Sequence, residues 1–317
     1  MSPAPGAVVV DLKFGRQEME AALQEAFKGR IVLQAADKDQ DLSNADYAVV
    51  WKPDADLFQR APNLKLLFSG GAGVDHLLGI PDLPDLPIIR FVDESLTSRM
   101  SEWVVLQCLS HLRQVLTYAK QQRDHLWHEL PQPEAKDLTV GVMGLGVLGR
   151  DTALKLKMMG FNVVGWSRTK KVIEGIDTFD AGGLDAFLSQ TDILVGLLPL
   201  TPETRGIFDR NVFEKLRKGG ALGGPIFINA GRGGSQMEPD LLKALQDGSL
   251  RGASLDVFSS EPHPPNGSFW DLENVIITPH AASASDMCAL FRHVERQITR
   301  FEHGQPLEHV VDRRAGY

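Results

Sequence analysis

One segment of this sequence restricts the fold more than any other, because it combines two apolar runs with a regular pattern of glycines. The run Thr139–Met143 leads into Gly144-Leu145-Gly146-Val147-Leu148-Gly149, and a helical pattern and a second apolar run, Asn162–Trp166, follow. A GxGxxG between a strand and a helix is typical of a dinucleotide-binding βαβ unit. Gly144 permits the tight turn, Gly146 lets the backbone approach a pyrophosphate, and Gly149 lets helix and strand pack closely. The amides at the helix N-terminus are then expected to face the phosphates.

The residues after the second apolar run indicate which dinucleotide is bound. In NAD-binding units a carboxylate about 20 residues past the first glycine holds the ribose 2′-hydroxyl. This chain instead has Ser167-Arg168-Thr169-Lys170-Lys171, with no carboxylate before Glu174. A hydroxyl followed by an arginine can bind a 2′-phosphate through charge-assisted hydrogen bonds. We therefore expect NADP(H) to be preferred, with NAD(H) possible; the alternative is that residues 168–171 form a solvated basic loop.

Length and composition limit the class of protein. The 317 residues suggest about two domains, and 43% hydrophobic with 23% charged residues is typical of globular chains in water. A net charge of −8 argues against nucleic acid as a partner. Cys108 and Cys288 lie far apart and form neither a zinc-type nor a disulfide pattern. No signal-like N-terminus and no apolar span of about 18 residues is present, so we expect a cytoplasmic protein without membrane or metal sites.

The distribution of apolar runs indicates two α/β units. The first hundred residues alternate short apolar runs with a helical pattern at Arg16–Phe27, which indicates a small, open, flavodoxin-like unit. From Asp137 onward strands and helices alternate, which predicts a doubly wound parallel sheet, the Rossmann fold, for the cofactor. The expected strands are Ala7–Leu12, Arg30–Gln34, Tyr47–Trp51 and Leu64–Ser69 in the first unit, and Thr139–Met143, Asn162–Trp166, Ile193–Leu197, Ile226–Asn229, Gly252–Val257 and Val275–Thr278 in the second.

The ends of the chain are expected to meet in one domain. A long helix is expected over Ser98–Arg123, with a broad apolar face that suits burial against the next domain or a second subunit. The helical pattern after Ser283 is expected to return to the first unit. Residues 1–98 and 284–317 would then form a split substrate-binding domain, and residues 99–283 the dinucleotide-binding domain.

Three polar side chains follow the last three expected strands. They are Arg232, Glu261 and His280. Because ligands bind at the carboxyl ends of the strands in such sheets, the three are expected to converge. Hydride addition to a keto acid develops charge on the carbonyl oxygen, so a proton donor and a cation must lie nearby. His280 is the expected donor, Glu261 can bond its other ring nitrogen, and Arg232 can polarise the carbonyl and bind the carboxylate.

Other chemistry-bearing residues allow two interpretations each. Asp256, at a strand end, is either a turn residue or a partner of the nicotinamide amide. His125 and His128 have a metal-like gap but no carboxylate or cysteine partners, which favours a solvated helix end. The segment Gly70-Gly71-Ala72-Gly73-Val74 follows an apolar run and forms either a flexible turn or a nest of free amides for a small carboxylate.

Taken together, these segments resemble the D-isomer-specific 2-hydroxyacid dehydrogenases. Four motifs carry the resemblance: GxGxxG, Asn229–Gly233, LDVFxxEP at Leu255–Pro262 and TPH at Thr278–His280. Within this family the chain is similar to the glyoxylate/hydroxypyruvate reductase A group, for example at Val50-Trp51-Lys52-Pro53 and at the C-terminal residues 311–317. The resemblance implies NADPH-dependent reduction of a small 2-keto acid, glyoxylate or hydroxypyruvate, to the D-2-hydroxy acid. It also implies a homodimer built around the cofactor domains.

The resemblance further implies a role for each matching residue. His280 is the general acid/base, Glu261 its partner, and Arg232 the substrate-orienting cation. The backbone of Gly73 and Val74 would bind the substrate carboxylate, and Trp51 would close the small pocket. The implied cofactor contacts are Gly144, Gly146, Val147, Leu148 and Gly149 around the pyrophosphate, Ser167 and Arg168 at the 2′-phosphate, Asp256 at the nicotinamide, and Leu198, Pro199, Thr204 and Ala230.

The chain departs from the family at a few positions, which bear on substrate choice rather than on reaction type. Gly231 replaces the usual alanine before the arginine, residues 233–235 are glycine-rich, and Trp103 replaces a smaller residue or tyrosine. Two alternatives stay open. One is a dehydrogenase for another D-2-hydroxy acid, phosphorylated or branched, although only Lys52 and Lys65 would lie near a substrate phosphate. The other is a dinucleotide-sensing, co-repressor-like binding protein.

Overall fold

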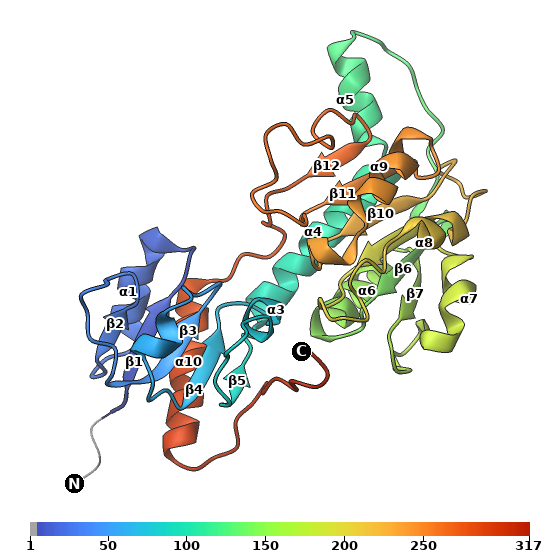
Figure 1. Ribbon diagram of the computed structural model, residues 1–317. Coiled ribbons are helices and arrows are strands. Elements are labelled where there is room, and N and C mark those ends of the chain that lie inside the picture. Colours follow the sequence, from blue (N-terminus) through green and yellow to red (C-terminus); the bar gives the residue numbers. More distant parts are fainter. Residues whose placement is uncertain (1–4) are drawn as a thin grey trace. The chain divides into compact units, whose positions relative to one another are not determined.

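The computed structural model describes residues 5–317, with the backbone alone for Arg16 and Gln17. The chain divides into two compact units (Figure 1). The first comprises Met1–Leu96 with Ser285–Tyr317, and the second comprises Thr97–Ala284. The borders expected from the sequence, at residues 98/99 and 283/284, lie within two residues of these. Each unit has its own sheet and its own buried core.

The first unit is built on a five-stranded parallel sheet with the strand order β2-β1-β3-β4-β5. This is the flavodoxin-like order, as the sequence predicted. The central strands are almost fully buried apolar runs, as parallel strands covered on both faces must be. The sequence did not predict β5, because two residues are too few to form a recognisable run. The strands are β1 (Ala7–Asp11), β2 (Val32–Gln34), β3 (Ala45–Val50), β4 (Leu66–Ser69) and β5 (Ile88–Ile89).

A helix from the C-terminal part of the chain completes the first unit. Figure 1 shows this helix, α10 (Met287–Glu302), beside the N-terminal strands, and it packs against α1 (Arg16–Ala26). Arg30, just after α1, donates to Glu302 at 2.7 Å, and the buried hydroxyl of Tyr47 on β3 donates to the same carboxylate at 3.0 Å. These bonds tie the returning chain to the N-terminal sheet. Two short helices, α2 (Leu57–Arg60) and α3 (Asp75–Leu78), follow β3 and β4.

The second unit contains a seven-stranded parallel sheet with the order β12-β11-β10-β9-β6-β7-β8. The six expected strands are present. The seventh, β8 (Asp177–Phe179), was not predicted because this short, partly exposed edge strand has no apolar run. The connections leave β6 in opposite directions, so the switch point lies between β6 and β9. The other strands are β6 (Thr139–Met143), β7 (Asn162–Trp166), β9 (Ile193–Gly196), β10 (Ile226–Asn229), β11 (Gly252–Leu255) and β12 (Val275–Ile277).

The helix predicted over Ser98–Arg123 is wrong in its extent. The structure has α4 (Glu94–Leu112) and α5 (Val115–Arg123), separated at Gln114, whose φ of +54° lies in the left-handed region. Such a φ cannot continue a right-handed helix, although the apolar pattern runs through it. Trp103 on α4 is buried in the core of the second unit. The remaining α-helices of this unit have five to twelve residues. They are α6 (Val147–Met158), α7 (Leu184–Leu188), α8 (Arg210–Lys215) and α9 (Glu238–Gln246).

Two further features concern the surface of the molecule. His125 and His128 are exposed in the coil beyond the end of α5. In residues 5–317 no group of acidic, histidine or cysteine side chains has the arrangement of a metal site. None of the helices in the same residues combines the length and the apolarity that a membrane span needs.

Candidate functional site

The glycine turn after β6 has the close approaches that the fingerprint requires. Gly144 has a φ of +105°, and a Cβ there would lie 2.5 Å from the carbonyl oxygen of Leu197 at the end of β9. A Cβ on Gly149 would overlap the carbonyl oxygen of Gly144. Gly146 is the N-cap of α6, and a Cβ there would meet no atom within 4 Å. The turn therefore leaves open space in front of the first amides of α6, which include those of Val147 and Leu148, and this cradle fits a pyrophosphate.

The other predicted cofactor residues border the switch point. Leu198 is buried directly after β9, and Ala230 is buried directly after β10. The Thr204 hydroxyl donates to the carbonyl of Pro199 at 2.6 Å and accepts the amide of Thr201 at 2.8 Å. Thr204 thus shapes the loop after β9 with its own side chain. These residues surround the carboxyl ends of β9 and β10, where ligands of doubly wound sheets bind.

The loop after β7 carries the predicted 2′-phosphate residues. Ser167 is largely buried, and its hydroxyl donates to the carbonyl of Thr169 at 2.7 Å, which curls the loop back at the strand end. Arg168, Lys170 and Lys171 are exposed on this loop. Three cations around a strand end provide the positive charge that a 2′-phosphate requires.

His280 and Glu261 form a hydrogen-bonded pair. The Nδ1 of His280 lies 2.9 Å from Oε2 of Glu261, and the two side chains are 35% and 23% exposed. The other carboxylate oxygen accepts the amide of Phe258 at 3.2 Å, which restrains the carboxylate. The φ of His280 is +53°, a left-handed conformation that is uncommon for residues other than glycine. A carboxylate on Nδ1 keeps the proton there, so Nε2 is the ring atom left to gain or release a proton.

Asp256 holds the turn that carries His280. This residue is 2% exposed, and its Oδ1 accepts the Thr278 hydroxyl at 2.5 Å and the Ala281 amide at 2.8 Å. The Ala282 amide donates to both carboxylate oxygens at 3.0 Å. The backbone carbonyl of Asp256 also accepts the amide of His280 at 2.8 Å. Asp256 therefore holds this turn, and because a carboxylate oxygen can accept more than one donor, its contact with the nicotinamide amide stays a prediction.

A buried amide network holds the turn of Arg232. Asn229, fully buried at the end of β10, donates from Nδ2 to the carbonyl of Arg232 at 3.2 Å and to Oε1 of Gln236 at 2.9 Å. Gln236 in turn donates to the carbonyl of Val257 at 3.2 Å. A Cβ on Gly233 would overlap the backbone of Phe258. The turns that carry Arg232 and Glu261 are therefore in direct contact.

Sequence reasoning missed these positioning residues. Asn229 begins the motif Asn229–Gly233 but had no predicted role, and Gln236 was not predicted as a site residue. A buried amide side chain just after a strand is a usable signal, because it must find partners for all its polar atoms. The hydrogen-bond partners of such an amide can be identified only from the folded structure, in which neighbouring strands are aligned.

Three of the four predicted substrate-binding residues, Trp51, Gly73 and Val74, follow strands β3 and β4 of the first unit's sheet, and the fourth, Arg232, follows β10 in the second unit. The Ser69 hydroxyl donates to the carbonyl of Gly73 at 2.8 Å, and this bond closes the glycine-rich turn after β4. In the part of the chain that the structure describes, the amides of Gly73 and Val74 donate to no protein acceptor. Two neighbouring free amides are the donors that a small carboxylate needs. Trp51 follows β3, the strand next to β4.

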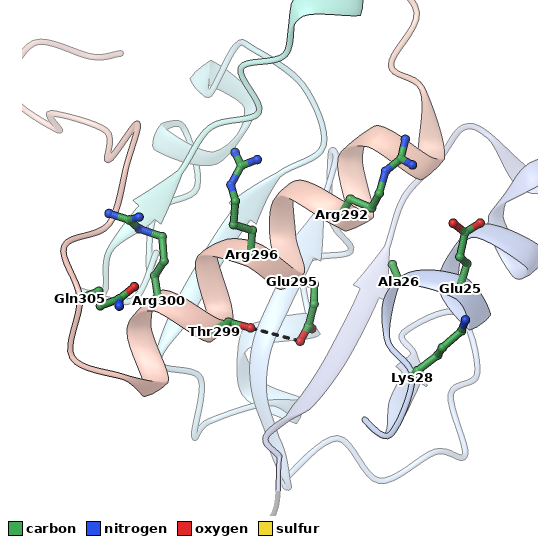
Figure 2. Close-up of a pocket in the computed structure, with 9 residues that line it drawn as sticks. All are labelled: Glu25, Ala26, Lys28, Arg292, Glu295, Arg296, Thr299, Arg300 and Gln305. Atoms are coloured by element: carbon green, nitrogen blue, oxygen red, sulfur yellow. Dashed lines mark hydrogen bonds between the residues drawn. The ribbon is translucent and has the colours of Figure 1, made fainter.

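A hollow of about 650 Å³ lies elsewhere, between α1 and α10 of the first unit (Figure 2). Figure 2 shows Arg292, Arg296 and Arg300 along one side of α10, and Glu25 and Lys28 on the segment at the end of α1. Arg296 and Arg300 approach Glu308 at 4.0 and 3.6 Å, and Glu295 pairs with Arg30 at 2.7 Å. Four basic and two acidic side chains line the hollow, and none of the residues predicted to bind cofactor or substrate is among them.

Comparison with known proteins agrees with this arrangement. A model of the family "D-isomer specific 2-hydroxyacid dehydrogenase, NAD binding domain" matches residues 105–282. An NADPH-dependent glyoxylate/hydroxypyruvate reductase from Sinorhizobium meliloti, solved with NADP and sulfate, is 62% identical with a TM-score of 0.97, over 98% of this chain and 100% of that one. A probable 2-hydroxyacid dehydrogenase from Rhizobium etli CFN 42, solved with NADP, HEPES and L(+)-tartaric acid, is 60% identical with a TM-score of 0.93, over 98% and 99%.

A third solved structure extends the similarity to lower identity. A D-isomer specific 2-hydroxyacid dehydrogenase from Xanthobacter autotrophicus Py2, in complex with NADPH and MES, is 39% identical over 99% of this chain and 100% of that one, with a TM-score of 0.92. The glycine cradle, the order of the strands and this end-to-end similarity agree. The chain belongs to the D-isomer-specific 2-hydroxyacid dehydrogenase family.

Proposed function

We propose that this protein reduces glyoxylate, hydroxypyruvate or a closely related small 2-keto acid with NADPH and forms the D-2-hydroxy acid. The observation that carries the proposal is the hydrogen-bonded pair of His280 and Glu261, at the carboxyl edge of the sheet that also carries the GxGxxG cradle. The similarity to the Sinorhizobium meliloti reductase, at 62% identity, supports the substrate class and the choice of NADPH.

The proposed reaction assigns one task to each polar residue. When bound, the reduced nicotinamide supplies the hydride that adds to the carbonyl carbon of the substrate. His280 donates the proton from Nε2 to the carbonyl oxygen, which becomes the hydroxyl group of the product. Glu261 holds Nδ1 and stabilises the imidazolium before the transfer. The guanidinium of Arg232 polarises the carbonyl and stabilises the charge that develops on its oxygen.

The substrate carboxylate and the cofactor phosphates would be held by backbone amides and cations. The free amides of Gly73 and Val74 suit the carboxylate, with Trp51 closing the pocket. The amides at the start of α6 suit the pyrophosphate. Ser167 and Arg168 suit the 2′-phosphate, because no carboxylate lies there to repel it.

The assigned site is tested by kinetics of single variants. His280→Ala and Arg232→Ala should each lower kcat/KM for glyoxylate by about 10²-fold or more, because each removes an interaction made in the transition state. His303→Ala, which alters an exposed histidine at the end of α10, is the matched control and should leave kcat/KM unchanged. Near-normal kcat/KM in both site variants would exclude these assignments.

Cofactor choice is tested separately. Arg168→Ala should raise KM for NADPH by about tenfold or more while KM for NADH stays the same, since a charge-assisted bond to the 2′-phosphate is lost. Arg210→Ala, on the exposed face of α8, is the matched control. Equal efficiency of NADH and NADPH with the unaltered protein would contradict the NADPH assignment.

We also propose a cytoplasmic homodimer without nucleic-acid or membrane partners. The second unit exposes several large apolar side chains on and after α4 and α5: Leu106, Val115, Leu126 and the fully exposed Trp127. Exposed apolar surface of this kind is typical of subunit interfaces. Cys108 and Cys288 are free thiols, which suits a reducing compartment. Trp127→Asp should shift the sedimentation coefficient to that of a monomer, whereas Trp270→Asp, at another exposed tryptophan, should not.

A further inference from the structure

Trp51 is held from several sides by other residues of the first unit. Its amide donates to the carbonyl of Asp11 at the end of β1, at 2.9 Å. The Asp11 carboxylate, 3% exposed, accepts the amide of Asp54 at 2.8 Å. Between them, Lys52 has a φ of +50°. The turn after β3 is therefore tied at both ends to the neighbouring strand, and the backbone of Trp51 has little freedom.

The indole ring of Trp51 is flanked by two other rings. The His76 ring on α3 lies 4.3 Å from it, centroid to centroid, with an angle of 47° between the planes. Phe14, from the loop after β1, meets it edge-on at 5.9 Å and 83°. Edge-to-face pairs of this kind restrict the rotation of the ring that they contact.

The glycines after β4 form the surface on which these rings lie. A Cβ on Gly71 would come within 2.8 Å of Cζ3 of Trp51. A Cβ on Gly70 would come within 3.2 Å of Cζ of Phe14. Real Cβ atoms essentially never approach as closely as 2.8 Å, so the glycine at position 71 is what lets the Trp51 ring lie this close to the turn, and the approach at Gly70 is tight. The same turn continues to Gly73 and its free amide.

We propose that Phe14 is a positioning residue, which holds Trp51 against Gly71 and thereby sets the largest substituent that a 2-keto acid substrate can carry at C3. This inference rests on the proposed function. A carboxylate on the amides of Gly73 and Val74 lies two residues along the chain from Gly71. C3 is two bonds from the carboxylate carbon and its substituent three, so a rigid indole at Gly71 limits the size of that substituent. Glyoxylate, with no C3, and hydroxypyruvate, with one hydroxymethyl group, fit such a limit.

The test compares substrates of increasing size in matched variants. The panel is glyoxylate, hydroxypyruvate, 2-oxovalerate and phenylpyruvate with NADPH. Phe14→Ala should raise the ratio of kcat/KM for 2-oxovalerate and phenylpyruvate to that for glyoxylate by about tenfold, because a freed indole vacates space. Phe14→Tyr keeps the ring and should keep the ratio of the unaltered protein. Phe58→Ala, at a partly buried phenylalanine of the first unit outside this cluster, controls for general loosening and should not change the ratio.

A second measurement follows the indole without turnover. With 5-fluorotryptophan incorporated, the ¹⁹F signal of Trp51 is assigned by its loss in Trp51→Phe. Phe14→Ala should shift and narrow this signal, as for a mobile ring, while Phe58→Ala leaves it in place. Gly71→Ala should also shift it, because the added Cβ must displace the ring.

The outcomes separate the two ideas. Absence of reduction of glyoxylate, hydroxypyruvate and the other 2-keto acids of the panel by the unaltered protein defeats the proposed function, whatever the variants do. Normal glyoxylate reduction with an unchanged size ratio in Phe14→Ala overturns the role of Phe14. An unchanged ¹⁹F signal for Trp51 in Phe14→Ala overturns it equally, since the ring would then be held by other contacts.

Discussion

The Asp256 carboxylate offers the most direct test of how the fold positions the candidate acid. In Asp256→Asn, the side-chain oxygen can stay at the Oδ1 position, where it accepts the Thr278 hydroxyl and the Ala281 amide. The new NH₂ group then replaces Oδ2 and faces the Ala282 amide, which in the unaltered protein donates to both carboxylate oxygens at 3.0 Å, so one of these two bonds is lost. Two donors are thus brought together in a site that is 2% exposed.

The expected magnitude follows from this single lost bond. A hydrogen bond to a buried charged group contributes about 1.5–3 kcal/mol. At about 2 kcal/mol, a unit of this size should melt about 4–8 °C lower. The turn that carries His280 loses one of its anchors, and a displacement of about 1 Å lowers kcat about 10²-fold. KM for NADPH should change little, because the GxGxxG cradle is formed by other residues.

Asp192→Asn is a matched control for this prediction. Asp192 is also 2% exposed in the second unit, and it accepts the amide of Thr139 at 2.8 Å. It precedes β9, so it lies at the amino edge of the sheet, away from the candidate site. Its replacement should leave kcat per folded molecule normal, whatever its effect on Tm. Calorimetry and steady-state kinetics measure both quantities, and normal Tm and kcat in Asp256→Asn would refute the reasoning.

Three further predictions concern the cradle, the tie of the C-terminal helix and the response to pH. Gly149→Ala places a Cβ on the carbonyl oxygen of Gly144, so Kd for NADPH, measured by fluorescence titration, should rise at least about tenfold; an unchanged Kd would count against the cradle. Tyr47→Phe removes the 3.0 Å bond to Glu302 and should lower the free energy of unfolding by about 1 kcal/mol in urea, with kcat unchanged; an equal or higher stability would contradict this. Burial, and then the nearby charges of Arg296 and His309, lower the pKa of His293 to about 4, from 6.5. Between these values the unfolded chain binds more protons, so stability should fall as the pH is lowered from 6.5 to 4, and His293→Phe should flatten the dependence of Tm on pH. A slope unaffected by that substitution would assign the titration to other groups.

The cofactor unit could be predicted closely because its signals are local. The strands at residues 139–143, 162–166 and 226–229 have the bounds expected from the sequence. Each is a short run rich in apolar residues, as expected for a strand covered on both faces of a parallel sheet. The elements that were missed, β5 and β8, are short and are defined by their neighbours rather than by their own residues. The break in the helix over residues 98–123 depends on one backbone angle, at Gln114, which the apolar pattern does not record.

The candidate site was predictable in its reactive groups and less so in their support. Arg232, Glu261 and His280 were found because each follows a strand and has a side chain suited to the reaction. Asn229 and Gln236 were not, because an amide has no chemistry that distinguishes it until its partners are known. The role of Asp256 was left open for the same reason.

The order of glycines, apolar runs and charged strand ends in this chain specifies a doubly wound sheet and the residues at its carboxyl edge. These patterns each involve only a few neighbouring residues, and hydrophobic burial and backbone sterics determine which of those residues form strands and which form turns. Only the folded structure decides which distant atoms meet: Nδ1 of His280 with Glu261, Gly233 with the backbone of Phe258, and Phe14 with Trp51. These contacts join residues from separate strands and turns, so they exist only once the sheet has aligned its strands.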